Sequence, residues 1–239
     1  MKQHYDLYKE EDFEVWQTLC NRQMSQLTNS ASATYLAGLK KINFSAIEIP
    51  KFNKINQKLK VLTKWELVVV PGLIPDLTFF ELMSNKKFPA TTWLRKKSEL
   101  DYLEEPDMFH DVFAHVPLLT DPFFVKFLAA LSNLGLTYGN NLDAIEALSR
   151  IYWFTVEFGL IREQDQLKIY GAGILSSSEE TAYCLSEKAT HFEFDLEKII
   201  HLNFRKDVMQ ENYCIISSYE QLYESIPEIN RKMYLMYGE

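Results

Sequence analysis

The sequence is poor in the residues that mark several large classes of protein. Its 239 residues include only 3 cysteines, 8 glycines and 8 prolines. Cys20, Cys184 and Cys214 are odd in number and form no CxxC pair, which argues against a disulfide framework and favours a reducing, cytoplasmic location. Long stretches without glycine or proline favour helices.

The chain also lacks the patterns expected of membrane and nucleic-acid-binding proteins. Its most apolar run, residues 67–73, is interrupted by Pro71 and falls far short of the roughly 20 residues that span a bilayer. The first 17 residues are charged and contain no apolar core of a signal peptide. The net charge of −8 disfavours a long nucleic-acid footprint. We therefore expect no membrane span and no nucleic-acid partner.

What the chain does have is a large apolar content, 47% hydrophobic and 14% aromatic residues. This length and composition predict one compact domain over residues 1–239, mainly α with small β elements. Apolar periodicity and breaker residues predict helices over 8–30, 76–87, 122–135 and 142–161. Short segments that are rich in β-branched residues or lie between breaker residues predict strands at 65–70, 91–95 and 213–216. The segment 171–173 (GAG) predicts a turn.

One carboxylate lies inside an aromatic and aliphatic stretch. Glu157 is embedded in residues 150–160, RIYWFTVEFGL. An ionised carboxylate in such surroundings needs a cation, a hydrogen-bond network or a metal. His110 and His115 lie upstream in a chain with only five histidines. Two imidazoles and one carboxylate form the set that holds non-haem Fe(II) and leaves coordination positions open. The sequence therefore suggests an iron site.

The spacing of the two histidines sets a condition on such a site. Residues five apart on a straight α-helix diverge by about 140°. Pro117 disfavours the α conformation at Val116, so we expect the helix to end near His115. His110 would then lie in the last turn and His115 at the exit, which would allow both rings to meet one ion.

Other interpretations of these residues remain open. One histidine could pack in the core, and Glu157 could be paired with Arg150 or another buried cation. A zinc peptidase fits poorly, because those enzymes place their histidines four apart with Glu beside the first, whereas here the spacing is five and the neighbour is Asp111.

Several longer motifs resemble a known family. They occur in the family's order within about residues 65–190: VPGLI (70–74), FPATTWLR (88–95), EPDMFHDVFAHVPLL (105–119), IYWFTVEFGL (151–160), YGAGILSS (170–177) and YCLS (183–186). On these motifs the chain resembles the pterin-dependent aromatic amino acid hydroxylases, and in particular the short bacterial members that act on phenylalanine.

The resemblance implies a set of site residues. The iron ligands and catalytic centre would be His110, His115 and Glu157. The pterin, similar to tetrahydrobiopterin, would contact the residues matching the family's cofactor positions: Gly72, Leu73, Ile74, Phe79 and Asp111. Phe79 would stack on the pterin ring, although an aromatic residue in an apolar helix is more often a core residue. Asp111 would reach the pterin through water.

The resemblance also implies a site for the amino acid substrate. Arg95 would hold the substrate carboxylate, a task that suits the planar guanidinium; without the resemblance it would be read as a solvated charge beside Lys96 and Lys97. The remaining positions matched to the substrate pocket are Tyr102, Pro106, Trp153, Phe158 and Ser176.

The implied activity is hydroxylation of L-phenylalanine to L-tyrosine, with Fe(II), a tetrahydropterin and O2. Alternatives are a tryptophan or tyrosine hydroxylase of the same family, and a non-catalytic sensor that binds iron or pterin. The length leaves no room for a regulatory domain or a tetramerisation helix, so we expect a single catalytic domain and a monomer.

Overall fold

The structure is a computed structural model that describes residues 1–239 except 102, 104, 206, 207 and 239. The elements of its first half are, in order, η1 (Tyr5–Leu7), α1 (Glu10–Ser30), α2 (Ala33–Lys41), α3 (Phe52–Leu62), β1 (Glu66–Val69), α4 (Asp76–Ser84), β2 (Lys87–Ala90), η2 (Lys97–Glu99), η3 (Phe109–His115) and η4 (Val116–Thr120). Those of its second half are α5 (Pro122–Thr137), α6 (Leu142–Tyr152), η5 (Trp153–Glu157), β3 (Gly159–Glu163), β4 (Gln166–Ile169), α7 (Ala172–Leu175), α8 (Ser178–Tyr183), β5 (Thr190–Glu193), α9 (Leu196–His201), β6 (Asn212–Ile216), α10 (Tyr219–Glu224) and α11 (Ile226–Tyr237).

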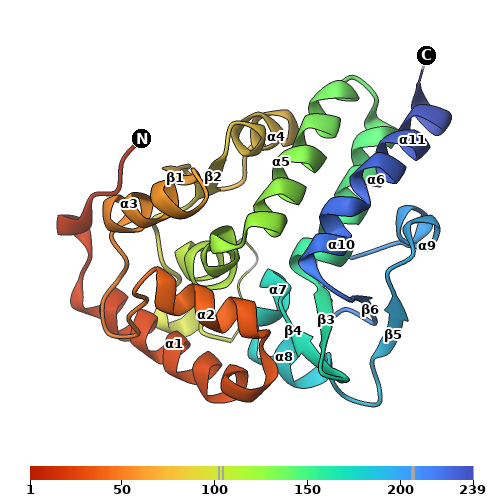
Figure 1. Ribbon diagram of the computed structural model, residues 1–239. Coiled ribbons are helices and arrows are strands. Elements are labelled where there is room, and N and C mark those ends of the chain that lie inside the picture. The colour runs from red at the N-terminus through yellow and green to blue at the C-terminus, as the bar shows by residue number, and fades with distance from the viewer. Residues whose placement is uncertain (102, 104, 206–207, 239) are drawn as a thin grey trace.

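Helix α5 runs through the middle of the molecule, between the N-terminal elements and the C-terminal helices (Figure 1). It contacts α4, α6, α10 and α11. Its start is fixed by Asp121, whose side chain accepts hydrogen bonds from the backbone N–H groups of Phe123 and Phe124 at 3.0 and 2.8 Å, with Pro122 at the first helical position. An apolar helix with neighbours on several sides is buried along most of its length, which explains its nearly continuous hydrophobic sequence.

In the described part of the chain, the strands form two small sheets. Strands β1 and β2 make a parallel pair, and the other sheet has the order β4-β3-β6-β5. In it β3 runs antiparallel to β4 and parallel to β6, and β5 runs parallel to β6. The mainly helical class with small β elements that the sequence predicted is therefore confirmed.

Three local predictions are wrong, and each has a physical reason. Residues 91–95 do not form a strand, because β2 ends at Ala90 and the next N–H groups bind carboxylates instead of a neighbouring strand. Segment 171–173 is not a turn, because Gly171 caps the short helix α7. The helix predicted over 142–161 ends earlier, and β3 begins at Gly159, where it pairs with β4 and β6.

No single helix in the described part of the chain has the length and hydrophobicity needed to cross a membrane. One pair, Phe109–Thr120 with Pro122–Thr137, meets the criteria of length and composition only when taken together, and it is bent by 112°.

Helix α2 packs so closely on η4 that one position requires glycine. A Cβ atom at Gly38 would lie 2.2 Å from the backbone O of Pro117 and 2.7 Å from its carbonyl C. We expect Gly38→Ala to lower the free energy of unfolding by about 1–3 kcal/mol, because backbone atoms must move to accept the methyl group. Urea denaturation would measure this. Ala37→Ser, on the exposed side of the same helix, should change stability by less than about 0.5 kcal/mol, and equal effects would contradict the prediction.

Candidate metal centre

His110 and His115 lie on one π-helical segment, η3 (Phe109–His115). In a π-helix each turn is closed by an i to i+5 hydrogen bond, so residues five apart lie nearly above one another. The π-helical segment ends at His115, as predicted, but the prediction that Val116 would lie outside the α region is wrong. Val116 has φ −61° and ψ −37° and begins the 3-10 helix η4. The wider turn, and not a helix exit, is what brings both rings to one side.

Glu157 lies at the end of a second π-helical segment, η5 (Trp153–Glu157). The backbone N–H of Phe158 closes this turn on the carbonyl of Trp153 at 2.9 Å. Helix α7 begins close to Glu157, and this close packing requires a glycine at position 171. A Cβ atom there would lie 2.4 Å from the backbone O of Glu157. Arg150 does not pair with Glu157; its guanidinium binds Glu146 and the carbonyl of Ile200.

The three side chains converge. His115 Nε2 lies 3.2 Å from His110 Nε2 and 3.2 Å from Glu157 Oε1. His110 Nε2 lies 3.6 Å from Glu157 Oε2. All three possible ligand atoms lie within 4.8 Å of one another. Two nitrogens and one carboxylate oxygen, from segments more than forty residues apart in the sequence, therefore face one small volume.

The charges at this point suit a cation. Burial lowers the pKa of His110 to about 4, against the opposing effect of Glu157, so the ring is neutral at pH 7. Burial alone would raise the pKa of Glu157, but His115, His110 and a hydrogen bond from Tyr152 together lower it to about 2. An ionised carboxylate beside an unprotonated imidazole is the protonation state that metal binding needs. The donor set thus fits the Fe(II) site that the sequence suggested.

A serine fixes the orientation of the His110 ring. Ser176 Oγ donates to the carbonyl of Ala172 at 2.9 Å and lies 2.9 Å from His110 Nδ1. Because the hydroxyl proton is used on Ala172, Ser176 accepts from the Nδ1–H of the imidazole. This tautomer leaves the lone pair of Nε2 directed at the other two ligand atoms. The sequence assigned Ser176 to the substrate pocket; in the structure its hydrogen bonds are to His110 and Ala172.

Arg95 is not a solvated charge. It is 8% exposed, and its Nε and Nη2 donate to the two carboxylate oxygens of Asp107 at 2.9 and 3.0 Å. The backbone N–H of Arg95 also donates to Asp107 Oδ2 at 3.0 Å, and that of His110 donates to Asp107 Oδ1 at 3.2 Å. Asp107 therefore links the arginine directly to the segment that carries the first histidine.

Asp111 is held against β2. Its Oδ2 accepts from the backbone N–H and the hydroxyl of Thr91 at 2.7 and 2.8 Å. Burial raises the pKa of Asp111 to about 6, although the two bonds from Thr91 oppose the increase. The contact of Asp111 with the pterin through water stays a prediction.

The residues predicted to bind a pterin lie on the loop after β1 and on α4. Within the described residues, no hydrogen bond uses the backbone N–H of Gly72, Leu73 or Ile74, so three consecutive donors are free for a ligand edge. Leu73 is 73% exposed. Phe79 is half-buried, with its ring edge-on to Tyr152 at 5.5 Å. A loop with free donors beside an accessible aromatic ring fits a planar heterocycle.

An aromatic group, formed by Trp153, Phe158 and Phe204, includes the first residue of the π-helical segment that ends at Glu157. The Trp153 ring stacks on Phe204 at 4.6 Å and packs against Phe158 at 4.7 Å. Gly173 allows Phe158 to lie against α7, since a Cβ there would be 2.6 Å from that ring. Pro106, predicted to wall the same pocket, is half-buried next to Asp107. Tyr102 lies outside the described residues.

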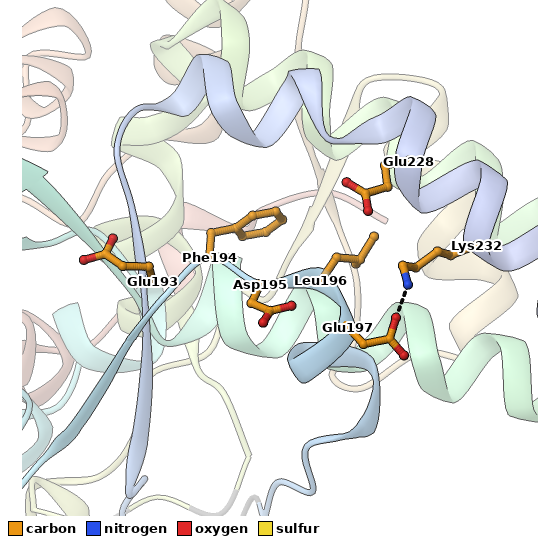
Figure 2. A pocket seen from close by; sticks show the side chains of 7 residues that line it. All are labelled: Glu193, Phe194, Asp195, Leu196, Glu197, Glu228 and Lys232. Atoms are coloured by element: carbon orange, nitrogen blue, oxygen red, sulfur yellow. Dashed lines mark hydrogen bonds and ion pairs between the residues drawn. The ribbon is translucent and has the colours of Figure 1, made fainter.

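A separate hollow lies elsewhere on the surface, between the end of β5, α9 and α11 (Figure 2). Its lining is mostly acidic, and the side chains of Lys232 and Glu197 form an ion pair across it. It contains none of the residues that the sequence singled out, so we do not assign it to the candidate site.

Three residues that hold the site were not singled out from the sequence: Asp107, Thr91 and Tyr152. Asp107 and Thr91 stand inside motifs that the sequence analysis quoted, so their place in those motifs was the only available signal. Tyr152 precedes Trp153 in a run of aromatic residues that gives no indication of a polar partner for its hydroxyl.

Comparison with known proteins agrees with this geometry. Residues 5–238 match the family model for biopterin-dependent aromatic amino acid hydroxylases. The phenylalanine-4-hydroxylase of Chromobacterium violaceum is 44% identical over 240 residues, which is 100% of this chain and 80% of that protein. The human phenylalanine-4-hydroxylase is 34% identical over 223 residues, 92% of this chain and 49% of its own. A crystal structure of the Chromobacterium enzyme with bound iron(III) and 7,8-dihydrobiopterin superimposes with a TM-score of 0.93, at 44% identity, covering 99% of this chain and 85% of that one.

The chain therefore belongs to the biopterin-dependent aromatic amino acid hydroxylase family. The resemblance drawn from its motifs is confirmed.

The buried pair between Arg95 and Asp107 should dominate local stability. The Asp107 side chain is completely buried, so Asp107→Asn would leave the guanidinium with a neutral partner in a place largely shielded from water. We expect the free energy of unfolding of the metal-free protein to fall by about 3–5 kcal/mol in urea denaturation. The control is Glu14→Gln, which breaks the exposed pair with Lys97 and should cost no more than about 1 kcal/mol. A similar small loss for both variants would contradict the prediction.

Proposed function

We propose that this protein is a phenylalanine 4-monooxygenase that hydroxylates L-phenylalanine to L-tyrosine with Fe(II), a tetrahydropterin and O2. The observation that carries the proposal is the convergence of His110, His115 and Glu157 on one point, in a chain of this family. The relatives named phenylalanine-4-hydroxylase and the crystal structure with iron(III) and dihydrobiopterin support the same activity and cofactors.

His110, His115 and Glu157 are the residues that would hold the iron. When bound, iron and tetrahydropterin supply the oxygen activation and the electrons for ring hydroxylation. The protein contributes the neutral imidazole of His110, the imidazole of His115, an ionised carboxylate and a hydrogen bond from His110 to Ser176 that fixes one ring. We assign the pterin to the free N–H groups of 72–74, the ring of Phe79 and the carboxylate of Asp111.

Within this proposal, Arg95 binds the substrate carboxylate. Asp107 uses only Nε and one proton of Nη2, so the other edge of the guanidinium, with Nη1, is free to form a second bidentate contact. With the carboxylate held there, the ring would extend toward the aromatic group of Trp153 and Phe158, with Pro106 as a further wall residue. This orientation directs the far carbon of the ring at the metal ligands.

Within this proposal residues 1–239 act as a single catalytic domain, working as a monomer in the cytoplasm. The match of the family model to residues 5–238 supports one domain, and the three buried thiols support a reducing compartment. Sedimentation at micromolar concentration would test the monomer, since a dimer would sediment at twice the mass.

Turnover with three amino acids tests the function directly. Protein purified without oxygen, loaded with Fe(II) and supplied with tetrahydrobiopterin and O2, should convert L-phenylalanine to L-tyrosine over many cycles. Preferred hydroxylation of tryptophan or tyrosine would replace the proposal with another activity of the same fold. Fewer than one product per protein would favour a sensor, and tight retention of zinc in place of iron would favour a hydrolase.

Glu157 provides a test of the ligand set. Glu157→Gln keeps the size of the side chain but removes its charge, so we expect most of the bound iron and all measurable turnover to be lost while the protein stays folded. Iron content and tyrosine formation are the measurements. Glu146→Gln, on the exposed partner of Arg150, should retain both. Full activity of Glu157→Gln would remove Glu157 from the site.

Arg95 provides a test of the substrate clamp. Arg95→Lys keeps a positive charge near Asp107 but cannot contact two carboxylates through a planar fork, so we expect KM for L-phenylalanine to rise roughly 10–100-fold with iron content unchanged. Lys97→Ala removes a neighbouring exposed cation and should leave KM as it is. An unchanged KM in Arg95→Lys would show that another residue binds the carboxylate.

A further inference from the structure

The indole N–H of Trp153 has a specific partner. It donates to the side-chain oxygen Oε1 of Gln210 at 2.9 Å. Trp153 occupies the first position of η5, the π-helical segment that ends at Glu157, and its ring stacks on Phe204. The tryptophan is therefore fixed at one face by stacking and at one edge by a hydrogen bond, next to a candidate metal ligand.

The amide of Gln210 can satisfy its surroundings in only one orientation. Its Nε2 donates to the carbonyls of Arg205 and Val208 at 2.7 and 3.2 Å, while Oε1 faces the N–H of Trp153. Rotating the amide by 180° would place a donor against the indole donor and an acceptor against two carbonyls. Gln210 is 6% exposed, so water does not compete for these bonds.

The backbone of Gln210 is held from outside the aromatic pocket. Its N–H donates to Glu180 Oε1 at 2.8 Å, and its carbonyl accepts from the hydroxyl of Tyr213 at 3.0 Å. The same Tyr213 hydroxyl donates to Glu180. Glu180 belongs to α8 and Tyr213 to β6. The backbone N–H and carbonyl of Gln210 and both polar atoms of its side chain therefore have hydrogen-bond partners. Through these bonds Gln210 connects α8 and β6 to the indole ring of Trp153.

We propose that Gln210 is a positioning residue for the aromatic substrate, which sets the rotation of Trp153 and through it the direction of the substrate ring. The inference rests on the proposed function and deepens it. Stacking on Phe204 alone allows the indole to slide or turn within the stack, whereas a directional bond at Nε1 fixes the angle. A pocket wall fixed in this way would hold the ring at the distance and orientation that productive hydroxylation needs.

Three variants separate positioning from general stability. Gln210→Leu removes both the acceptor and the donors at nearly the same volume. Gln210→Glu keeps an oxygen acceptor for the indole but loses the N–H donors to the two carbonyls. Thr63→Val is the control, because it removes a hydrogen bond to the carbonyl of Leu119 in a part of the fold that does not touch the aromatic group.

Each variant is measured for thermal midpoint, iron content, KM for pterin, KM and kcat for L-phenylalanine, and tyrosine formed per pterin oxidised. For Gln210→Leu we expect KM for L-phenylalanine to rise roughly tenfold and the coupling of pterin oxidation to tyrosine to fall, with iron content and KM for pterin unchanged. For Gln210→Glu we expect KM within about twofold of wild type despite a lower thermal midpoint, since the indole bond is kept.

The pattern across the variants decides the outcome. If KM follows the thermal midpoint in all three, or if Gln210→Leu has the KM and coupling of Thr63→Val, the proposal is wrong and Gln210 is a structural residue. If Gln210→Leu does not fold, benzothienylalanine at position 153 replaces the indole N–H with sulfur and leaves Gln210 intact. It should raise KM by a similar factor, and an unchanged KM would overturn the proposal.

The wild-type measurement keeps the two proposals apart. If wild-type protein hydroxylates no aromatic amino acid, the proposed function fails and the role of Gln210 fails with it. If wild-type protein forms tyrosine and the loss of the indole bond has no effect, only the role of Gln210 fails.

Discussion

The structure depends on the close approach of two imidazoles and one ionised carboxylate in one small volume. The two Nε2 atoms lie 3.2 Å apart and the carboxylate lies 3.2 and 3.6 Å from them, in a volume largely shielded from water. Burial keeps His110 neutral, and the imidazoles together with Tyr152 keep Glu157 charged. Such a group is costly to assemble, so the surrounding fold has to hold it. Two π-helical segments, η3 and η5, hold it in place. A π-helical turn contains one residue more than an α-helical turn, so it directs the ligand side chains toward one another where an α-helix would direct them apart.

The hydrogen bonds around the centre link the separate tasks of the site. Asp107 binds the guanidinium of Arg95 and the backbone of His110 with the same carboxylate, so the candidate substrate clamp and the first candidate ligand move as one unit. Ser176 fixes the other side of the His110 ring. Thr91 holds Asp111, which places the loop of β2 against the same segment. Within the proposed function, a substrate carboxylate bound at Arg95 would be connected to His110 through the single buried side chain of Asp107.

Much of this could be predicted from the sequence, and the failures have a common cause. The helical class and the main helices follow from apolar periodicity, and the motifs around His110 and Glu157 indicated the family before any coordinates. The π-helical turns could not be predicted, because they are stabilised by tertiary contacts and not by local propensity. Pro117 disfavours the α region at Val116 as a local constraint, yet packing keeps Val116 in that region. The partner of Arg95 was missed for the same reason, since Asp107 lies twelve residues away and no local rule pairs them.

The two sides of the candidate pocket are fixed by different kinds of interaction, and this difference has a functional consequence. The polar end rests on a charge-assisted bidentate pair that is fully buried and tolerates almost no displacement. The aromatic end rests on stacked rings, which restrain separation but not rotation, and on one neutral hydrogen bond from Trp153 to Gln210. Within the proposed function, the weaker restraint governs the end at which the ring would be oxidised, so substitutions around Trp153 should change the preferred ring substrate more easily than substitutions at Arg95.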